Sequence, residues 1–241
     1  MVTKFSSNGD LYEHVASKER LDEAIALGYF QQILKAIHHL HTNDIAHRDI
    51  KLQNVVISDE NVLKLIDFGF AQRIDSDDDL NSTKTTIIKD RWDIKGTRGY
   101  ISPEMLVAQT KISKLGDFNQ ESFGIEDDEN TKSNDLEVSV DLKASDIFSL
   151  GVLLFEMVVG QPPFLNAAPE DSCYRMFYIQ KRVPRFWKIH RKTRELDSQN
   201  LLSNEFKDLI EQLLTPFPNK RPTIDEVMAH PWCTGLEQSD N

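Results

Sequence analysis

Apolar residues recur at helical spacing in several stretches of the chain. In residues 22–43 they fall every three or four positions, which predicts an amphipathic helix with one buried face. Residues 206–214 repeat this pattern. Residues 144–159 are apolar on nearly every side and Gly160 follows them, so we expect a buried helix that ends at this glycine. Thr223–Glu226 has the sequence of a capping box, which predicts a short last helix.

Short apolar runs predict β structure beside these helices. Val55–Ile57 and Val62–Leu65 flank a polar turn, so they are expected to pair as a hairpin. Residues 1–10 are typical of the end of a strand that continues into a turn. Residues 70–95 are polar and have no periodicity of their own, which indicates either a functional loop or a disordered segment.

The net charge is −11 at pH 7, and two acidic segments carry the excess. Residues 116–141 hold nine carboxylates and one lysine, and residues 75–79 add four aspartates. The rest of the chain is close to neutral, so the acidity argues against a general nucleic-acid-binding surface and says little about the fold. Residues 116–139 are also poor in apolar side chains, so we expect a disordered insert there. A specific acidic docking segment is the alternative.

The two cysteines, Cys173 and Cys233, do not form a ligand-spaced pair, so we expect free thiols in a reducing compartment. This favours a cytoplasmic location, with the nucleus as the alternative. The longest apolar stretch, Ile147–Val159, contains Glu156 and is shorter than the ~20 residues of a membrane span. We therefore expect neither a membrane nor a nucleic acid as a partner.

Two groups of cationic side chains have more than one interpretation. Residues 181–194 contain seven lysines and arginines and no acid. We expect a solvated loop anchored by Phe186 and Trp187, with a nuclear-import signal or a polyanion-binding patch as the alternative. Three histidines cluster at residues 38–41 on the first predicted helix. No cysteine or carboxylate nearby completes a metal site, so they are interpreted as surface or core histidines.

The stretch His47–Asn54 carries a carboxylate, an ammonium and an amide between a predicted helix and a predicted strand. Asp67–Gly69 follows the second strand of the hairpin, thirteen residues after Asn54. A single Asp or Asn in a loop is usually a turn residue. Together, the two motifs resemble the catalytic loop and the metal-binding loop of the eukaryotic protein kinases. Lys51 and the threonine at position 97 resemble the serine/threonine branch, and further details weakly resemble the calcium/calmodulin-dependent group.

The resemblance implies a mostly α fold, the C-terminal lobe of the α+β protein-kinase fold, in which a small β hairpin carries the catalytic and metal loops. No two of the ten glycines are separated by one residue, so no Gly-x-Gly-x-x-Gly loop occurs, and no Val-Ala-Ile-Lys strand is present. We therefore expect the N-terminal β lobe to be missing. Residues 1–241 would then be a partial protein kinase domain. Its last small-lobe strand and hinge would lie at 1–12, and its C-terminal lobe, with the insert at 116–139, at 13–241.

The resemblance also implies a role for each matching residue. Asp49 and Lys51 are the expected catalytic residues: Asp49 accepts the proton of the substrate hydroxyl, and Lys51 reaches the γ-phosphate of ATP. Asn54 and Asp67 are expected to bind Mg²⁺. The expected nucleotide contacts are Thr3, Lys4, Ser6, Asp10, Lys51, Asn54, Val56 and Asp67. The expected residues of the substrate loop and its structural support are Thr97, Glu104, Asp146 and Arg221.

These residues suit a serine/threonine protein kinase that transfers the γ-phosphate of ATP to a protein hydroxyl, with ATP and Mg²⁺ as cofactors. The alternative is a catalytically inactive kinase-like lobe that acts as a protein-binding module. The joint presence of Asp49, Lys51, Asn54 and Asp67 favours the enzyme, since a binding module has no need of them. A protein substrate is the expected partner, and a small lobe or a regulatory partner acting in trans is left open.

Overall fold

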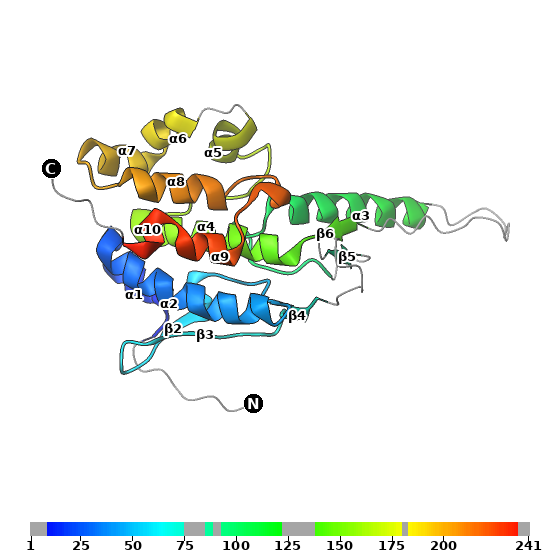
Figure 1. Ribbon diagram of the computed structural model, residues 1–241. Helices are drawn as coiled ribbons and strands as arrows, with labels where there is room; N and C mark the ends of the chain where they lie inside the picture. The colour runs from blue at the N-terminus through cyan, green and yellow to red at the C-terminus, as the bar shows by residue number, and fades with distance from the viewer. Residues whose placement is uncertain (1–8, 75–84, 89–92, 122–137, 180–182, 236–241) are drawn as a thin grey trace, which may run out of the picture.

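The computed structural model describes residues 9–74, 85–88, 93–121, 138–179 and 183–235 (Figure 1). The helices within them are α1 (Leu11–Ser17), α2 (Glu23–Thr42), α3 (Pro103–Glu121), α4 (Leu142–Val159), α5 (Ser172–Tyr174), α6 (Val183–Ile189), α7 (Arg191–Ser198), α8 (Asn204–Leu213), α9 (Ile224–Ala229) and α10 (Pro231–Thr234). Single-turn helices in the connections are η1 (Leu52–Asn54), η3 (Arg175–Ile179) and η4 (Pro218–Lys220). The strands are β1 (Ile45–Ala46), β2 (Val55–Ile57), β3 (Leu63–Leu65), β4 (Gln72–Arg73), β5 (Thr86–Ile88) and β6 (Val138–Val140).

Helix α4 forms the centre of the core and packs against α2 and α8 (Figure 1). It begins where the Asp141 side chain accepts a hydrogen bond from the amide of Ala144 at 2.9 Å, an N-cap that satisfies one free donor of the first turn. It ends at Gly160, which has a φ of +77°. A Cβ at this position would lie 1.9 Å from the carbonyl oxygen of Glu19, so glycine is required both by the turn and by the close approach.

The candidate site lies between α2, α4 and a β hairpin. The loop His47–Asn54 connects β1 to β2, and β2 pairs with β3 in an antiparallel register that places Val55 opposite Leu65. Helix α2 contacts both β1 and β3, and α4 contacts β1. The loop is therefore held on one side by the central helix and on the other by the hairpin.

The predicted fold class, a helical lobe with one small hairpin and a missing N-terminal β lobe, is wrong. In the described residues, β1–β5 lie between Ile45 and Ile88, and with β6 they form three two-stranded antiparallel sheets. Besides β2–β3, these are β1 with β4 and β5 with β6. The short strands β1, β4, β5 and β6 show no alternating pattern in the sequence, and tertiary contacts set their pairing. Only the β2–β3 pairing follows from the apolar pattern.

The helices expected from periodicity and caps are confirmed. Helix α2 buries the expected apolar face, and α4 is buried along nearly its whole length. Thr223 and Glu226 form the expected capping box of α9. Phe186 and Trp187 are buried as expected, but the basic segment around them forms α6 and α7 and is not a loop.

The acidic segment has regular structure at both of its ends. Helix α3 continues to Glu121, and Val138 and Ser139 belong to β6, although disorder was expected for residues 116–139. Residues 122–137 lie outside the described residues. No helix in the described part of the chain is long and apolar enough to cross a bilayer.

Candidate active site

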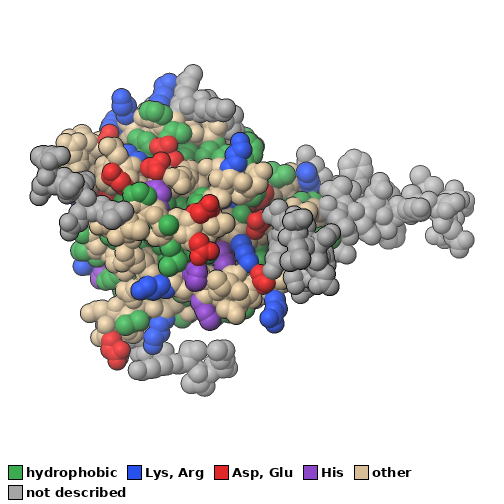
Figure 2. All heavy atoms as spheres, viewed as in Figure 1, with side chains coloured by type: hydrophobic (Ala, Val, Ile, Leu, Met, Phe, Trp, Pro, Cys, Tyr) green, Lys and Arg blue, Asp and Glu red, His purple; other side chains and the backbone are tan. Residues whose placement is uncertain are grey.

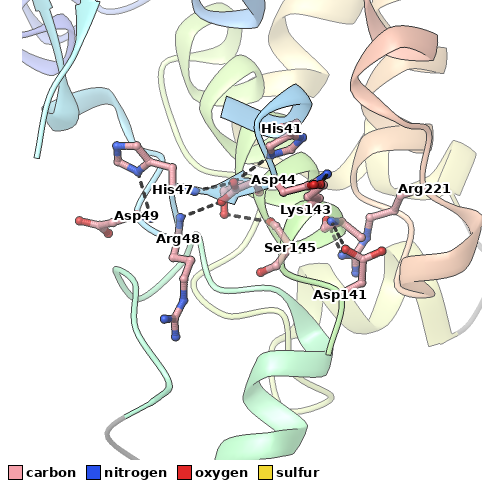
Figure 3. Close-up of polar contacts among 12 residues, drawn as sticks. His41, Asp44, His47, Arg48, Asp49, Asp141, Lys143, Ser145 and Arg221 are labelled. Carbon is pink, nitrogen blue, oxygen red and sulfur yellow. Dashed lines mark hydrogen bonds and ion pairs between the residues drawn. The ribbon is translucent and has the colours of Figure 1, made fainter. Parts of the chain in front are cut away.

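One buried carboxylate fixes the loop His47–Asn54 to helix α4. Asp146 is 1% exposed. Its Oδ2 and Oδ1 accept hydrogen bonds from the backbone amides of His47 and Arg48, each at 2.8 Å. His41 Nε2 lies 3.0 Å from the same Oδ2 (Figure 3). Arg48 has a φ of +69°, and the paired amide bonds hold this left-handed turn, which sets the direction of the residue that follows.

Asp49, Lys51, Asn54 and Thr97 form a closed hydrogen-bonded group, here called the Asp49 quartet. Oδ2 of Asp49 accepts from Lys51 Nζ at 2.7 Å and from Asn54 Nδ2 at 2.9 Å. Oδ1 accepts from Thr97 Oγ1 at 2.8 Å, and Lys51 Nζ donates to the same hydroxyl at 2.7 Å. The structure thus brings together both residues expected to be catalytic, an expected metal ligand and an expected residue of the substrate loop.

The quartet sets the charge of Asp49. Burial on its own raises the pKa of this carboxyl, but hydrogen bonds from Lys51 and Thr97, the charge of Lys51 and the Asn54 amide together hold the pKa below its ordinary value. Asp49 is therefore a carboxylate at neutral pH, and its oxygens act only as hydrogen-bond acceptors. In this state it can orient an incoming hydroxyl group and take up its proton.

Asn54 and Asp67 occupy neighbouring positions at one end of the β2–β3 hairpin. The amide of Ile66 donates to the carbonyl oxygen of Asn54 at 2.9 Å, which extends the pairing to the residue before Asp67. Asn54 Nδ2 also donates to the carbonyl oxygen of Asp49 at 2.7 Å, and this bond fixes the orientation of the amide group. Asp67 is exposed and has a φ of +59°, and its Oδ1 accepts from the amide of Gly69 at 3.1 Å. Together, the two side chains offer an amide oxygen and a carboxylate.

A ring contact joins the loop of Asp49 to the loop of Asp67. The imidazole of His47 packs edge-on against Phe68, with ring centroids 5.1 Å apart. His47 Nε2 also lies 3.2 Å from the carbonyl oxygen of Ile66. Ile66 and Phe68 are the residues on either side of Asp67, so the position of Asp67 depends on the placement of the loop His47–Asn54.

Two of the expected nucleotide contacts lie side by side. Asp10 and Val56 form an isolated antiparallel bridge, and Asp10 also caps α1 with its carboxylate. Val56 is partly buried on the hairpin that carries Asn54. Thr3, Lys4 and Ser6 lie outside the described residues.

Arg221, directly after η4, and Glu104 on α3 form a buried ion pair. The two terminal nitrogens of the guanidinium donate to the two carboxylate oxygens at 2.7 and 2.6 Å. The Arg221 side chain is 0% exposed, and it also donates to the carbonyl oxygens of Ala144, Thr215 and Pro216. A bidentate guanidinium with this many partners fixes the start of α3 against the start of α4.

Sequence comparison shows the family of this chain. The family model described as "Protein kinase domain" matches residues 1–119 and 137–233. The chain belongs to the protein kinase family. An Aurora kinase of Debaryomyces hansenii is 32% identical over 99% of this chain, and the human SNF-related serine/threonine-protein kinase is 29% identical over 99%. The calcium/calmodulin-dependent protein kinase type II alpha chain of Drosophila melanogaster is 30% identical over 99%. By this homology the chain is a serine/threonine protein kinase domain.

The kinase domain spans less than half the length of these relatives, with 45%, 24% and 36% of each covered in the same order. The comparison corrects two predictions. The likeness is not confined to a hinge and a C-terminal lobe, because the family match starts at residue 1 and runs to residue 233. It is also not specific to the calcium/calmodulin-dependent group, because the Aurora and SNF-related kinases match at similar identity. A few short motifs do not reveal how much of the chain matches a family or which subgroup it resembles. That information is spread over many apolar positions along the chain.

A protein kinase domain implies ATP and a divalent metal ion, and the donor set of this site fits the ion. Mg²⁺ prefers oxygen ligands and keeps several waters, so one or two protein groups suffice beside the phosphates. Asn54 and Asp67 supply an amide oxygen and a carboxylate at adjoining positions. The described part of the chain contains no cluster of three or more His, Cys, Asp or Glu side chains that would hold a metal on its own. The ammonium of Lys51, 18% exposed, is available to a phosphate oxygen.

The sequence analysis did not predict the partners of two buried polar residues, His41 and Glu156. His41 lies four positions after Ile37 on the buried face of α2, so a polar partner was to be expected, and Asp146 is that partner. Glu156 interrupts the apolar helix α4 and accepts a hydrogen bond from the Tyr100 hydroxyl. Burial raises the pKa of Glu156, and the bond from Tyr100 opposes that rise without cancelling it. In both cases the signal is a polar residue within a buried apolar face.

Proposed function

We propose that this domain transfers the γ-phosphoryl group of ATP to the hydroxyl of a serine or threonine in a protein substrate. The bond from the hydroxyl oxygen to the γ-phosphorus forms while the bond from that phosphorus to the β–γ bridging oxygen breaks. ADP leaves with this bridging oxygen, and the hydroxyl proton passes to a carboxylate of the domain. The Asp49 quartet is the observation that carries the proposal, because it holds an ionised carboxylate, an ammonium and an amide in one hydrogen-bonded unit.

Asp49 orients the substrate hydroxyl and accepts its proton. Its pKa is held below the ordinary value, so the group is ready as an acceptor throughout the neutral range. Thr97 and Lys51 hold the two carboxylate oxygens in place, so little reorganisation is needed when the hydroxyl arrives. General-base assistance of this kind contributes roughly 10²–10⁴-fold to the rate.

In this proposal Lys51 contacts the transferred phosphoryl group, and Asn54 and Asp67 hold Mg²⁺. When bound, the ion neutralises charge on the phosphates. The chain's own contribution is positioning: Asp146 holds the loop of Lys51, and the His47–Phe68 contact holds the loop of Asp67. Phosphoryl transfer depends mainly on such positioning and on charge stabilisation.

A protein is the proposed substrate, and residues 96–104 are the proposed docking loop. Thr97 joins this loop to Asp49, and Glu104 joins it to Arg221, so both ends are tied to the core. We also propose a cytoplasmic or nuclear location, which is supported by the free thiols of Cys173 and Cys233.

The test uses the purified protein with γ-labelled ATP, Mg²⁺ and dephosphorylated casein, together with ATP hydrolysis measured without any protein substrate. We expect label on serine or threonine, and Asp49→Asn should lower both activities by at least ~10²-fold. Nucleotide affinity should change by no more than a few fold, because Asp49 contacts the hydroxyl and not the nucleotide.

Glu205→Gln is the matched control, since Glu205 is an exposed carboxyl on α8 outside the site. It should leave both activities unchanged. If the wild type binds ATP without transfer or hydrolysis, the kinase proposal fails and the binding-module alternative takes its place. Equal rates for Asp49→Asn and the wild type would remove Asp49 from the role of base.

A further inference from the structure

A cavity of about 640 Å³ opens between the C-terminal end of α2, the N-terminal end of α4 and residues 218–225. This volume lies within the roughly 300–1,000 Å³ of typical ligand sites. No residue of the Asp49 quartet lines it, although His41, which does line it, also contacts Asp146. On the face drawn in Figure 2, acidic and histidine side chains gather over α2 and α9.

The cations in the cavity wall are already paired within the fold. Lys143 Nζ contacts Asp44 Oδ1 at 2.7 Å, so these two charges compensate each other. Arg221 also lines the cavity, but its guanidinium is committed to Glu104 and to three backbone carbonyl groups. Neither cation is therefore available to attract an anionic ligand.

Two carboxylates of the wall, Asp141 and Asp225, are not paired with a lysine or an arginine among the described residues. Asp141 accepts the amide of Ala144 at 2.9 Å as the N-cap of α4, a bond that leaves its charge in place. Asp225 is 73% exposed and contacts His38 Nε2 at 3.1 Å. Among the described residues, no lysine or arginine pairs with either carboxylate. The cavity wall therefore offers two carboxylates that no lysine or arginine of the described residues neutralises.

The rest of the wall suits the aliphatic part of a basic side chain. Ile147, Pro218, Pro222 and Ile224 supply apolar surface next to the carboxylates. Lysine and arginine cover apolar surface with their methylene groups while the charged end reaches a carboxylate. A purely apolar ligand would leave the carboxylates without a partner, and a small anion would be repelled by them.

We propose that this cavity binds a basic segment of a partner protein, with a lysine or arginine side chain against Asp141 and Asp225. The occupant is a short basic peptide segment, of which a few residues enter the cavity of about 640 Å³. The proposal does not depend on phosphoryl transfer, since none of the residues that carry it belongs to the Asp49 quartet.

The probe is a fluorescein-labelled peptide, Ala-Arg-Pro-Arg-Ala, which has no hydroxyl and so cannot be phosphorylated. Its glutamate counterpart, Ala-Glu-Pro-Glu-Ala, is the control peptide. Fluorescence anisotropy should show saturable binding of the arginine peptide alone, weakened by added salt. The double variant Asp141→Asn with Asp225→Asn should weaken binding about tenfold, because two charge contacts are lost. Asparagine keeps the N-cap of α4, so the fold is preserved.

The matched control is the double variant Glu170→Gln with Glu205→Gln, which removes the same number of charges from exposed positions elsewhere. It should bind the arginine peptide like the wild type. The imidazole resonances of His41 should shift on binding, because this ring lines the cavity. Equal weakening by both double variants, equal binding of both peptides, an unshifted His41 or no binding at all would overturn the proposal.

Discussion

The backbone amide of Arg48 donates to Oδ1 of Asp146, 98 positions further along the chain, at 2.8 Å. The other oxygen of the same carboxylate accepts the amide of His47. One buried side chain at the start of the central helix therefore determines where Asp49 stands. The geometry of the candidate active site depends on α4 as much as on its own loop.

Replacing Asp146 with asparagine tests this relationship. Asparagine offers one acceptor oxygen, so one of the two amides loses its partner and a donor is placed where an acceptor is needed. We expect a loss of about 1–3 kcal/mol in the free energy of unfolding. Hydrogen exchange at His47 and Arg48 should become faster, and the phosphoryl-transfer rate should fall. Urea denaturation and exchange measured by NMR provide the readouts.

Asp22→Asn is the control for this prediction. Asp22 is 74% exposed and contacts only the neighbouring Arg20 among the described ion pairs. The stability of this variant should stay within about 0.5 kcal/mol of the wild type. Equal stability of the two variants would show that Asp146 does not hold the loop.

The Thr97 hydroxyl should control the protonation of Asp49. Thr97→Val removes one of the hydrogen bonds that lower the pKa of Asp49, so this pKa should rise. The carboxylate is then protonated at a higher pH during acidification, and the acid limb of the turnover profile should move to higher pH. Thr97→Ser keeps the hydroxyl and should keep the profile. The measurement is turnover as a function of pH for both variants. Identical pH profiles for Thr97→Val and Thr97→Ser would show that the Thr97 hydroxyl does not affect the pKa of Asp49.

Asp67 is expected to serve as a metal ligand, and Asp67→Asn is the sharpest change at this position. Asparagine tolerates the φ of +59° better than alanine would, so the loop should keep its shape. We expect Mg²⁺-dependent ATP binding to weaken at least ~10-fold and phosphoryl transfer to be lost, because the charge of the ligand is removed. Calorimetric titration with ATP in the presence and absence of Mg²⁺ measures the effect.

The control for Asp67 is Glu60→Gln, an exposed carboxyl in the turn of the same hairpin. Equal losses of ATP binding in Asp67→Asn and Glu60→Gln would indicate a general effect of charge near the nucleotide and not the loss of a ligand.

Parts of this fold follow from the sequence because local signals define them. The 3.6-residue pattern defines α2, and the capping box defines α9. The motifs His47–Asn54 and Asp67–Gly69 indicate the residues of the candidate site before their geometry is known.

Two of the contacts between distant segments at this site could not be predicted from the sequence. The bond from Thr97 to Asp49 spans 48 positions, and the contact of His41 with Asp146 spans 105. The short pairings β1–β4 and β5–β6 were missed because strands of two or three residues carry no readable alternation. Tertiary packing determines which of these distant segments contact each other.

Breaking the pair of Arg221 and Glu104 should be costly. Arg221→Met leaves the Glu104 carboxylate, 15% exposed, without its partner, so we expect a loss of about 3–5 kcal/mol in the free energy of unfolding. Adding Glu104→Gln should restore part of this loss, because the unpaired charge is removed. Urea denaturation of the single and double variants measures both effects.

Arg20→Met is the comparison for Arg221→Met, because the contact of Arg20 with Asp22 is an ion pair at the surface. This change should cost about 0–1 kcal/mol. If Arg221→Met cost no more than Arg20→Met, the buried pair would not be the element that fixes α3 against α4.

Glu156 should make the stability of the domain fall as the pH rises. Burial raises the pKa of this carboxyl above its ordinary value, even though the Tyr100 hydroxyl bond acts in the opposite direction. The unfolded chain ionises Glu156 from about pH 4.3 upward, whereas the folded chain ionises it only at a higher pH. As the pH rises between these two pKa values, the unfolded state becomes progressively more favoured. The part of the unfolding free energy that the protonated Glu156 contributes at low pH is therefore lost as the pH passes the pKa of the folded state.

Glu156→Gln removes this titration and keeps an acceptor for Tyr100. The unfolding free energy of the variant minus that of the wild type should therefore increase from about pH 4 to pH 7. A difference that stays constant across this range in urea titrations would show that Glu156 has the same pKa in the folded and unfolded chains.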